Sequence, residues 1–291
     1  CSFRRFGGKG VTERRDAVFG TDAGNVTGAV CMKVCVLQMN VVKGNREANR
    51  NTVRRMTEQA VSASCPPDVL VLPELWSTGY ELEKARELSS PMGEDDAAFL
   101  ASLAREYHVA FAGGSVLSER DGAVHNRAQV IERDGRYVTG YDKVHLFRLM
   151  DEHRYLTPGR ERCLFDMGGM RCALAVCYDI RFCEFIRALA VNGAEVLFVG
   201  AEWPATRREH WETLLRARAV ENEMYVVACN RCGTSGTETF AGSSMIIAPD
   251  GTVLAHAGEK EEIAGAEIEL SAVRRMRETI PVFLDRVPEL Y

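Results

Sequence analysis

The 291-residue chain carries 36 basic and 41 acidic side chains, has a net charge of -5 at pH 7 and is 46% hydrophobic. These values are typical of a globular protein with a sizeable core, and they exclude the clustered basic surface that nucleic-acid binding requires. No apolar stretch approaches the roughly 20 residues that span a bilayer, and the N-terminus lacks a secretory signal pattern, so we expect a cytosolic protein whose cysteines are mostly reduced.

The N-terminal segment, residues 1–31, differs in character from the rest of the chain. It contains six glycines and shows no sustained period, whereas a regular strand pattern follows at once from Met32. Its composition predicts an extension that is disordered or not native to the protein. We therefore expect residues 32–291 to form the functional domain.

Apolar runs and helical spacing alternate along that domain. In chain order they predict a strand at 33–39, a helix at 46–63, a strand at 68–73, a helix at 94–107, strands at 109–117, 126–132, 136–141 and 172–177, a helix at 181–192, a strand at 195–200, a helix at 208–222, strands at 224–230, 243–248 and 252–256, and a helix at 271–277. Strands that follow helices indicate crossovers, while "AQVIERDGRYVTGY" predicts a hairpin around Asp134 and Gly135. The pattern predicts an α/β fold with mixed sheets and no internal repeat. Gly113 and Gly114 lack the spacing of a nucleotide-binding loop.

Three segments share one layout, in which a reactive type of side chain follows an apolar run. They are "DVLVLPELWSTGY" with Glu74, "GRYVTGYDKVHLF" with Lys143 and "RCALAVCYDIRF" with Cys177. Strand ends often carry functional groups, because the strand fixes position and the loop admits a ligand. Each residue also has an ordinary interpretation: Glu74 as a solvated charge, Lys143 as a surface lysine and Cys177 as a small core residue.

Together, the three side chains supply complementary parts of one reaction. A thiol needs a base or a positive neighbour to become a nucleophile. A partly buried carboxylate can accept that proton and later deliver it to a leaving amine, and an ammonium group stabilises an oxyanion. Glu74, Lys143 and Cys177 thus predict an acyl-transfer site.

The ordered stretches "LPELWSTGY", "YDKVHLF" and "CYDIRFCE" resemble the three signature blocks of the nitrilase, or carbon-nitrogen hydrolase, superfamily. The resemblance extends from Met32 to the C-terminus. It implies a four-layer αββα sandwich with two mixed β-sheets, hydrolysis through a cysteine thioester, and no metal or organic cofactor. It also implies a homodimer or larger homo-oligomer, and "RVPELY" is a candidate partner-binding tail.

The same resemblance implies roles for individual residues. Glu74 is the general base, Lys143 the oxyanion stabiliser and Cys177 the nucleophile, with the backbone N–H of Tyr178 completing the oxyanion hole. Glu152, in "LMDEHRYLTPG", matches a second glutamate that many members place beside the lysine. Its alternative is a surface residue in a charged loop.

The segment from Ala201 to Gly233 resembles the omega-amidase branch of the superfamily, which hydrolyses the terminal amide of 2-oxo acid amides. A substrate with a carboxylate needs a fixed cation, which arginine provides as a two-pronged donor. Arg181 is the first candidate and Arg207 the second. Arg181 could instead form an ion pair with Asp179 or Glu184, Arg207 could be a solvated charge at a helix start, and Trp203 could wall the pocket or pack beneath a loop.

The remaining cysteines leave several functions open. An odd offset from Cys177 predicts that Cys172 points to the opposite face of the same strand, in the core. Cys183 lies near the nucleophile in sequence, and Cys229 and Cys232 have the spacing of a zinc knuckle or redox pair without the second pair that zinc needs. The roles of Cys183, Cys229 and Cys232 stay open.

The alternatives to an omega-amidase are of three kinds. Within the family, the substrate could be an N-carbamoyl amino acid, a deaminated glutathione or a nitrile. Outside catalysis, the chain could be a binding protein that keeps the fold without the chemistry. A thiol-redox protein would use Cys177 with Cys183, or Cys229 with Cys232.

Overall fold

Two β-sheets stacked face to face form the centre of the computed structural model, which describes residues 30–290. In spatial order the first sheet contains β15 (Glu262–Glu269), β1 (Cys31–Gln38), β2 (Val69–Val71), β4 (Ala110–Arg120), β5 (Ala123–Ile131) and β6 (Tyr137–Asp142), with β3 (Ser90–Pro91) paired to β4. The second contains β14 (Val253–His256), β13 (Met245–Ile247), β10 (Tyr225–Asn230), β9 (Val196–Ala201), β8 (Met170–Val176) and β7 (Leu164–Met167). A separate small ribbon pairs β11 (Thr234–Ser235) with β12 (Glu238–Thr239).

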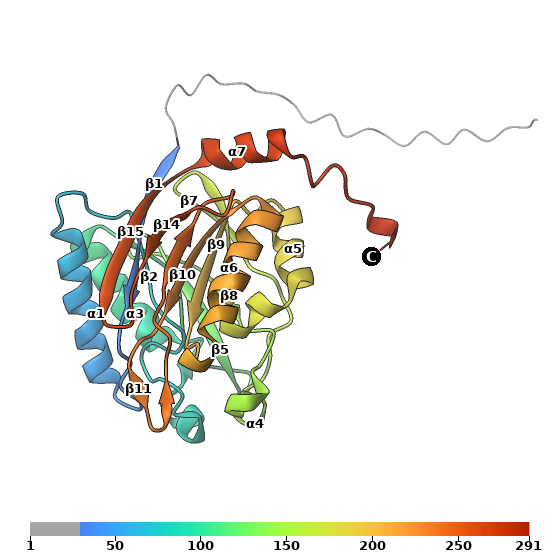
Figure 1. Ribbon diagram of the computed structural model, residues 1–291. Coiled ribbons are helices and arrows are strands. Elements are labelled where there is room, and N and C mark those ends of the chain that lie inside the picture. Colours follow the sequence, from blue (N-terminus) through green and yellow to red (C-terminus); the bar gives the residue numbers. More distant parts are fainter. Residues whose placement is uncertain (1–29, 291) are drawn as a thin grey trace, which may run out of the picture.

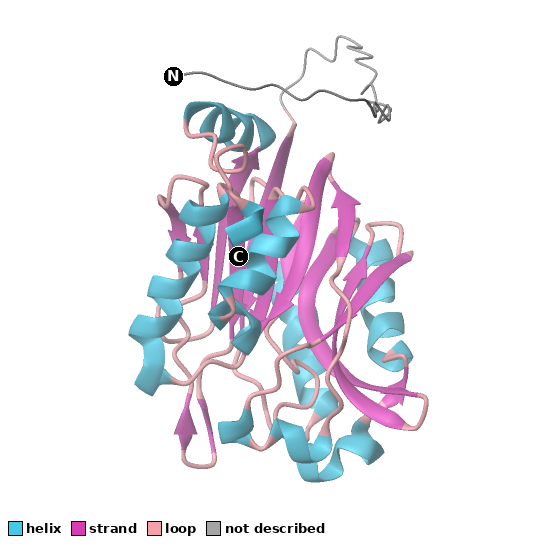
Figure 2. Cartoon of the chain, turned by 90° about the vertical axis from the view of Figure 1, so that its right-hand side faces the viewer, coloured by secondary structure: helices cyan, strands magenta, loops and turns pink. Residues whose placement is uncertain are grey.

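Helices cover the outer face of each sheet, as Figure 2 shows. The helices are α1 (Arg46–Val61), α2 (Ala85–Leu88), α3 (Glu94–Tyr107), α4 (Glu152–Tyr155), α5 (Cys183–Val191), α6 (Arg208–Asn222) and α7 (Leu270–Thr279). Short 3-10 turns are η1 (Leu82–Lys84), η2 (Arg148–Met150), η3 (Cys177–Arg181), η4 (Ala205–Arg207) and η5 (Pro288–Leu290). α1 and α3 pack on the first sheet, and α6 packs on the second.

Both faces of the central strands are buried, which explains their nearly continuous apolar sequences. In β1, Val34 and Val36 face the core between the sheets, while Leu37 faces the core beneath α1 and α3. Both sheets mix parallel and antiparallel pairs: β1 pairs parallel to β2 and antiparallel to β15, and β9 pairs parallel to both β8 and β10. The predicted four-layer αββα sandwich is confirmed.

Glycines allow the two sheets to touch where β2, β4 and β9 meet. Gly113 and Gly114 lie in a bulge of β4 with φ of +76° and +73°. A β-carbon on Gly114 would lie 2.6 Å from the Cβ of Leu72, and one on Gly200 would lie 3.0 Å from the Gly114 Cα. The Gly-Gly pair thus serves sheet packing, which agrees with its exclusion as a nucleotide loop.

Several predicted boundaries differ from the structure. The strand at 68–73 shortens to β2, because Pro73 has no N–H with which to continue the ladder. The strand at 172–177 ends at Val176, and the helix at 181–192 begins at Cys183 because η3 intervenes. The parity argument for Cys172 was therefore wrong, although that residue is buried in the core as expected. β7 and β15 were missed, whereas the hairpin of β5 and β6 is confirmed.

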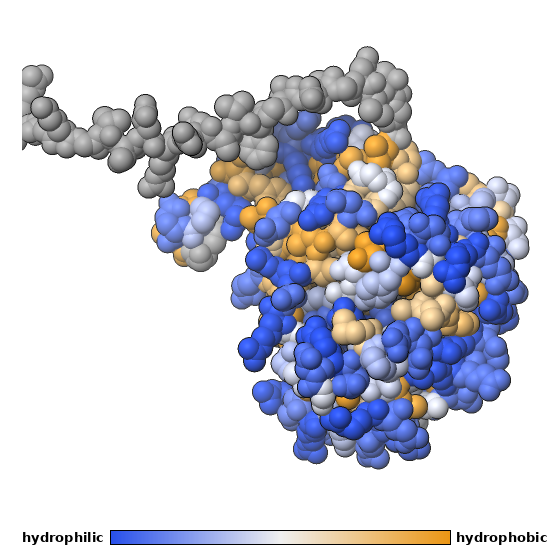
Figure 3. All heavy atoms as spheres, turned by 180° about the vertical axis from the view of Figure 1, so that it is seen from behind, coloured by the Kyte–Doolittle hydropathy of each residue, from blue (hydrophilic) through white to orange (hydrophobic). Residues whose placement is uncertain are grey.

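The first described residues belong to the first sheet and its core, since Val30 packs against the core between the sheets. Cys31 already belongs to β1, one residue before the predicted domain start, and residues 1–29 of the predicted extension lie outside the described residues. After α7 the chain extends away from the sandwich (Figure 1). From behind, the surface is mostly hydrophilic, but apolar residues gather beside this C-terminal segment (Figure 3).

Candidate active site

Four chain segments bring functional side chains together where strands end. Glu74 follows β2, Lys143 follows β6, Cys177 follows β8 and Glu202 follows β9. Each strand is held rigidly in a sheet, so the residue just after it is fixed without being part of the ladder. Glu152 reaches the same place from the first turn of α4.

Lys143 lies between two carboxylates. Its Nζ is 2.7 Å from Glu74 Oε1 and 2.8 Å from Glu152 Oε1, and all three side chains are fully buried. The surface interpretations of Glu74, Lys143 and Glu152 are therefore wrong. A buried charge is tolerated only when it is paired and hydrogen-bonded, and here every charge has a partner.

Neighbouring groups fix the two carboxylates. Asn126 Nδ2 donates to Glu74 Oε1 at 2.8 Å, and the backbone N–H of Glu202 donates to Glu74 Oε2 at 3.0 Å. The Tyr80 hydroxyl donates to Glu152 Oε1 at 2.7 Å, and the Phe147 backbone N–H donates to Glu152 Oε2. These contacts leave each carboxylate little freedom to turn.

Burial and charge oppose each other in this cluster. Burial disfavours the ammonium of Lys143, but Glu152 and Glu74 outweigh that effect and hold its pKa above the ordinary value. Burial raises the pKa of the Glu152 carboxyl, and the Lys143 charge offsets this only in part. Lys143 is consequently a permanent fixed cation at neutral pH.

Cys177 lies at the turn between β8 and η3. Its φ is +46°, a left-handed conformation that costs a non-glycine residue free energy and is often found at functional sites. Burial raises the pKa of the thiol well above its ordinary value, Glu74 raises it further and Lys143 opposes them. The side chain is buried like a core residue, yet it lies among charges, which a packing role does not explain.

Asp179 organises the turn that carries Cys177. Its carboxylate accepts hydrogen bonds from the Val176 N–H at 2.8 Å, the Tyr141 hydroxyl at 2.7 Å and the His145 N–H at 3.1 Å, and it lies 2.7 Å from His145 Nδ1. The residue is fully buried. It therefore ties the Cys177 turn to the loop that follows Lys143, and it is not the ion-pair partner of Arg181.

A narrow pocket of about 10 Å³ opens beside Cys177. Its lining residues are Phe147, Cys177, Tyr178, Arg181, Glu202, Trp203, Pro204 and Arg207. The structure thus brings the predicted substrate-binding residues to the predicted nucleophile. A larger groove exists elsewhere, but it contains none of these residues.

Trp203 contacts both arginines of the pocket. The Arg181 guanidinium lies 4.8 Å from the centre of the Trp203 ring, and one of its nitrogens is 3.1 Å from His210 Nδ1. The indole N–H donates to the Arg207 carbonyl at 2.8 Å, and Trp203 also packs against Trp211. Trp203 therefore both lines the pocket and packs beneath the η4 loop, and Arg207 is half-buried rather than fully solvated.

Sequence reasoning missed Glu202. It is fully buried, its Oε2 lies 3.3 Å from the Arg231 guanidinium, and its Oε1 has no hydrogen-bond partner among the described residues. Burial raises the pKa of Glu202 to about 8, Arg231 opposes the shift and Glu74 adds to it. The available signal was the position of Glu202 at the end of an apolar run, the layout that singled out Glu74 and Cys177.

The other cysteines lack the features of a reactive pair. Cys183 is exposed, and Cys229 and Cys232 are buried free thiols. Burial raises the pKa of Cys232 to about 11 and that of Cys229 further, so neither forms a thiolate readily at neutral pH. Neither belongs to a group of three possible metal ligands within residues 30–290.

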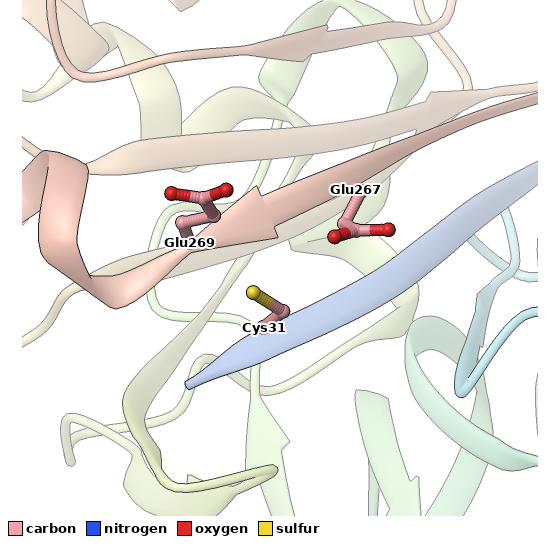
Figure 4. A group of neighbouring side chains, drawn as sticks. All are labelled: Cys31, Glu267 and Glu269. Atoms are coloured by element: carbon pink, nitrogen blue, oxygen red, sulfur yellow. The ribbon is translucent and has the colours of Figure 1, made fainter. Parts of the chain in front are cut away.

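One such group does occur, on the paired strands β1 and β15. Figure 4 shows Cys31, Glu267 and Glu269 on the surface of this strand pair. All three are exposed, and exposed acidic groups of this kind are common without an ion. The group contains none of the predicted site residues.

A thiol, adjacent carboxylates and a fixed ammonium are the parts of acyl transfer through a cysteine. The chain belongs to the carbon-nitrogen hydrolase family, whose model matches residues 33–278. It is therefore an enzyme that hydrolyses carbon–nitrogen bonds, as the signature blocks predicted.

Known proteins similar to this chain carry amidase names. The chain is 45% identical to 2-oxoglutaramate amidase of Bacillus subtilis over 224 residues, which cover 77% of this chain and 86% of the relative. It is 35% identical to omega-amidase YafV of Escherichia coli over 257 residues, or 87% and 96% of the two chains. The solved carbon-nitrogen hydrolase of Helicobacter pylori matches with a TM-score of 0.85 at 29% identity, covering 90% of this chain and 97% of that chain.

Proposed function

We propose that the protein hydrolyses the terminal amide of a small 2-oxo acid amide, such as 2-oxoglutaramate, to the 2-oxo acid and ammonia. The observation that carries this proposal is the pocket in which Cys177, Arg181 and Arg207 meet. The names of the amidase relatives support the same substrate class.

The first half of the proposed reaction forms a thioester. Glu74 accepts the thiol proton as the Cys177 sulfur attacks the amide carbon, so a C–S bond forms and the carbonyl oxygen becomes an oxyanion. The Lys143 ammonium and the Tyr178 backbone N–H stabilise that oxyanion. Glu74 then donates its proton to the amide nitrogen, the C–N bond breaks and ammonia leaves.

The second half releases the acid. Water attacks the thioester carbon while Glu74 accepts a water proton, and the C–S bond breaks as the tetrahedral adduct collapses. The proton returns to the Cys177 sulfur. Glu152 supports both steps by holding the Lys143 ammonium together with Glu74, which agrees with its 2.8 Å contact.

The two arginines suit the distal carboxylate of such a substrate. Arg181 is held by the Trp203 ring and His210, and a guanidinium fixed in this way loses little side-chain entropy on binding. The pocket is narrow, with a volume of about 10 Å³, and so has no room for a bulky acyl chain. This geometry favours a short dicarboxylic monoamide over a bulky amide.

The test compares Cys177→Ala with Cys183→Ala. Both substitutions remove one thiol, but Cys183 is exposed outside the pocket. We expect the parent and C183A to release ammonia from 2-oxoglutaramate, and C177A to lose at least about 10³-fold in kcat. Intact-mass spectrometry should detect the acyl adduct on the parent and on C183A, but not on C177A.

Other outcomes would point to the alternatives. Ammonia release by C177A equal to the parent would exclude Cys177 as the nucleophile. No release by any variant, with turnover of an N-carbamoyl amino acid, a deaminated glutathione or a nitrile, would keep the site and replace the substrate. Loss of activity in C183A, together with a disulfide between Cys177 and Cys183 after mild oxidation of the parent, would support a thiol-redox role.

We further propose a cytosolic homodimer whose catalytic domain comprises residues 32–291. No helix within the described residues is long and apolar enough to cross a membrane. Exposed apolar side chains on the C-terminal segment, Ile280, Leu284 and Leu290, support its role as a partner-binding tail. Leu284→Asp should shift the mass measured by light scattering from dimer to monomer, whereas Leu149→Asp, at an exposed leucine of η2, should not. An L284D variant that stays dimeric would contradict the tail's role.

A further inference from the structure

A second, larger hollow lies at the open edge of the sandwich. It has a volume of about 500 Å³ and lies between β6, the edge strand of the first sheet, and the segment 157–164 that leads into β7, the edge strand of the second. It shares no lining residue with the pocket at Cys177. We call it the edge groove.

Arginines outnumber carboxylates in the lining of the edge groove, four against three: Arg120, Arg127, Arg160 and Arg162 against Asp121, Asp142 and Glu161. Arg120 and Arg127 both contact Asp142, at 2.8 and 2.7 Å, and so neutralise that carboxylate at the groove floor. Arg160 and Arg162 are exposed at the rim, and neither has a carboxylate partner within 4.0 Å among residues 30–290. Two guanidinium groups are therefore available to a ligand, which must also avoid the exposed carboxylates of Asp121 and Glu161 in the same lining.

His125 gives a second, independent indication of a ligand. The residue lines the groove and is only 4% exposed, yet its Nδ1 has no hydrogen-bond partner within the described part of the chain. Buried polar atoms in folded proteins are nearly always satisfied, so a buried imidazole nitrogen without a partner beside an open groove suits a ligand group.

These groups define the chemistry of the ligand. Guanidinium groups form paired hydrogen bonds with the oxygens of carboxylates and phosphates, and an imidazole N–H adds a donor to the same oxygens. The groove is lined mainly by polar groups rather than by an apolar surface. A small anion with two or more carboxylate or phosphate groups fits this description.

Residues of the groove floor are direct neighbours in sequence of residues in the active site. Asp142 directly precedes Lys143, and Arg127 directly follows Asn126, which holds Glu74. The Lys143 N–H donates to the Asn126 carbonyl at 2.8 Å, and the Gly159 N–H donates to the Lys143 carbonyl at 2.8 Å. An anion that moves Arg127 or the 157–164 segment therefore acts on the backbone that positions Lys143.

We propose that the edge groove binds a small multivalent anion and that its occupancy alters catalysis at Cys177. The coupling is mutual, because a ligand that changes the site at Lys143 is itself bound more or less tightly when the active site is filled.

The experiment uses the full chain with inorganic pyrophosphate and citrate as separate probes, so that phosphate and carboxylate chemistry are distinguished. Arg160→Ala/Arg162→Ala removes the two rim charges. Arg133→Ala/Arg136→Ala is the matched control, since it removes two exposed charges at the far turn of the same hairpin. Arg181→Ala/Arg207→Ala removes the cations of the active-site pocket.

We expect calorimetry to show that at least one probe binds to the parent, and equally to R133A/R136A and R181A/R207A. Binding of the same probe to R160A/R162A should be at least tenfold weaker. The bound probe should change kcat or KM of the parent at least threefold, and this effect should vanish in R160A/R162A. Binding lost in R181A/R207A but retained in R160A/R162A, or no binding of either probe, would overturn the site. Binding without any change in kcat or KM would overturn the coupling.

Discussion

The buried surroundings of Glu202 change the pH at which this side chain loses its proton. It is fully buried between the Glu74 carboxylate, to which its backbone donates, and the Arg231 guanidinium. A carboxyl group normally loses its proton near pH 4.3, but burial raises the pKa of Glu202 to about 8. Over that interval the folded protein holds a proton that the unfolded chain has released.

This difference predicts a pH-dependent stability. Between about pH 4.3 and 8 the folded state binds more protons than the unfolded state, so the free energy of unfolding falls as pH rises. Glu202→Gln removes that dependence. The gain in Tm of E202Q over the parent should be larger at pH 8 than at pH 5, whereas Glu47→Gln, at an exposed position of α1, should show no such trend. Equal gains in Tm at both pH values would contradict the raised pKa of Glu202.

The residues found from sequence are those that stand within a distinctive local pattern. Glu74, Lys143 and Cys177 each end an apolar run, and the structure places all three together. Asn126, Tyr80 and Asp179 support them just as closely, but through contacts with residues 38 to 72 positions away in sequence. Only the folded arrangement of the strands makes these contacts visible.

At the scale of elements, the turn η3 depends on one carboxylate. Asp179 accepts from two backbone N–H groups, a tyrosine hydroxyl and the His145 ring, so its removal would leave several buried donors without partners. Asp179→Ala should therefore cost about 3–5 kcal/mol of stability and lower kcat, because Cys177 and the loop after Lys143 lose their common anchor.

A surface aspartate provides the comparison. Asp166 pairs with Arg171 on the exterior, and Asp166→Ala should change stability by less than about 0.5 kcal/mol. Urea unfolding of both variants measures the difference, and ammonia release at saturating substrate measures kcat. If D179A proved as stable and active as D166A, the anchoring role would be wrong.

Element prediction failed where polar residues conceal a strand. β15, "EIAGAEIE", carries three glutamates and is mostly exposed on one face. Its alternation of apolar and polar residues therefore did not stand out. Its length is set by pairing with β1. Conversely, the run at 68–73 looked longer than β2 because Leu72 and Pro73 are buried outside the ladder. In both cases tertiary contacts, rather than local propensity, set the strand boundaries.

At the scale of the whole molecule, the close contact between the two sheets leaves little room for an added side-chain atom. Gly114→Ala combines a φ of +73° with a β-carbon 2.6 Å from that of Leu72, whereas Gly122→Ala has a similar φ of +76° and no heavy atom within 4 Å. Both carry backbone strain of about 1 kcal/mol. G114A should cost a further 1–3 kcal/mol, approximately, from overpacking. Equal unfolding midpoints for the two variants in urea would show that the sheets can separate at no cost.

The pairing of β15 with β1 joins the last strand to the first among residues 30–290, as Figure 1 shows. Contacts between residues so distant in sequence slow folding, since a long loop must close before they form. During synthesis, the outer edge of β1 must wait for residues 262–269 to leave the ribosome, and until then it is open to strands of other chains. Completion of the first sheet is thus a late event, after every proposed catalytic side chain has already been made.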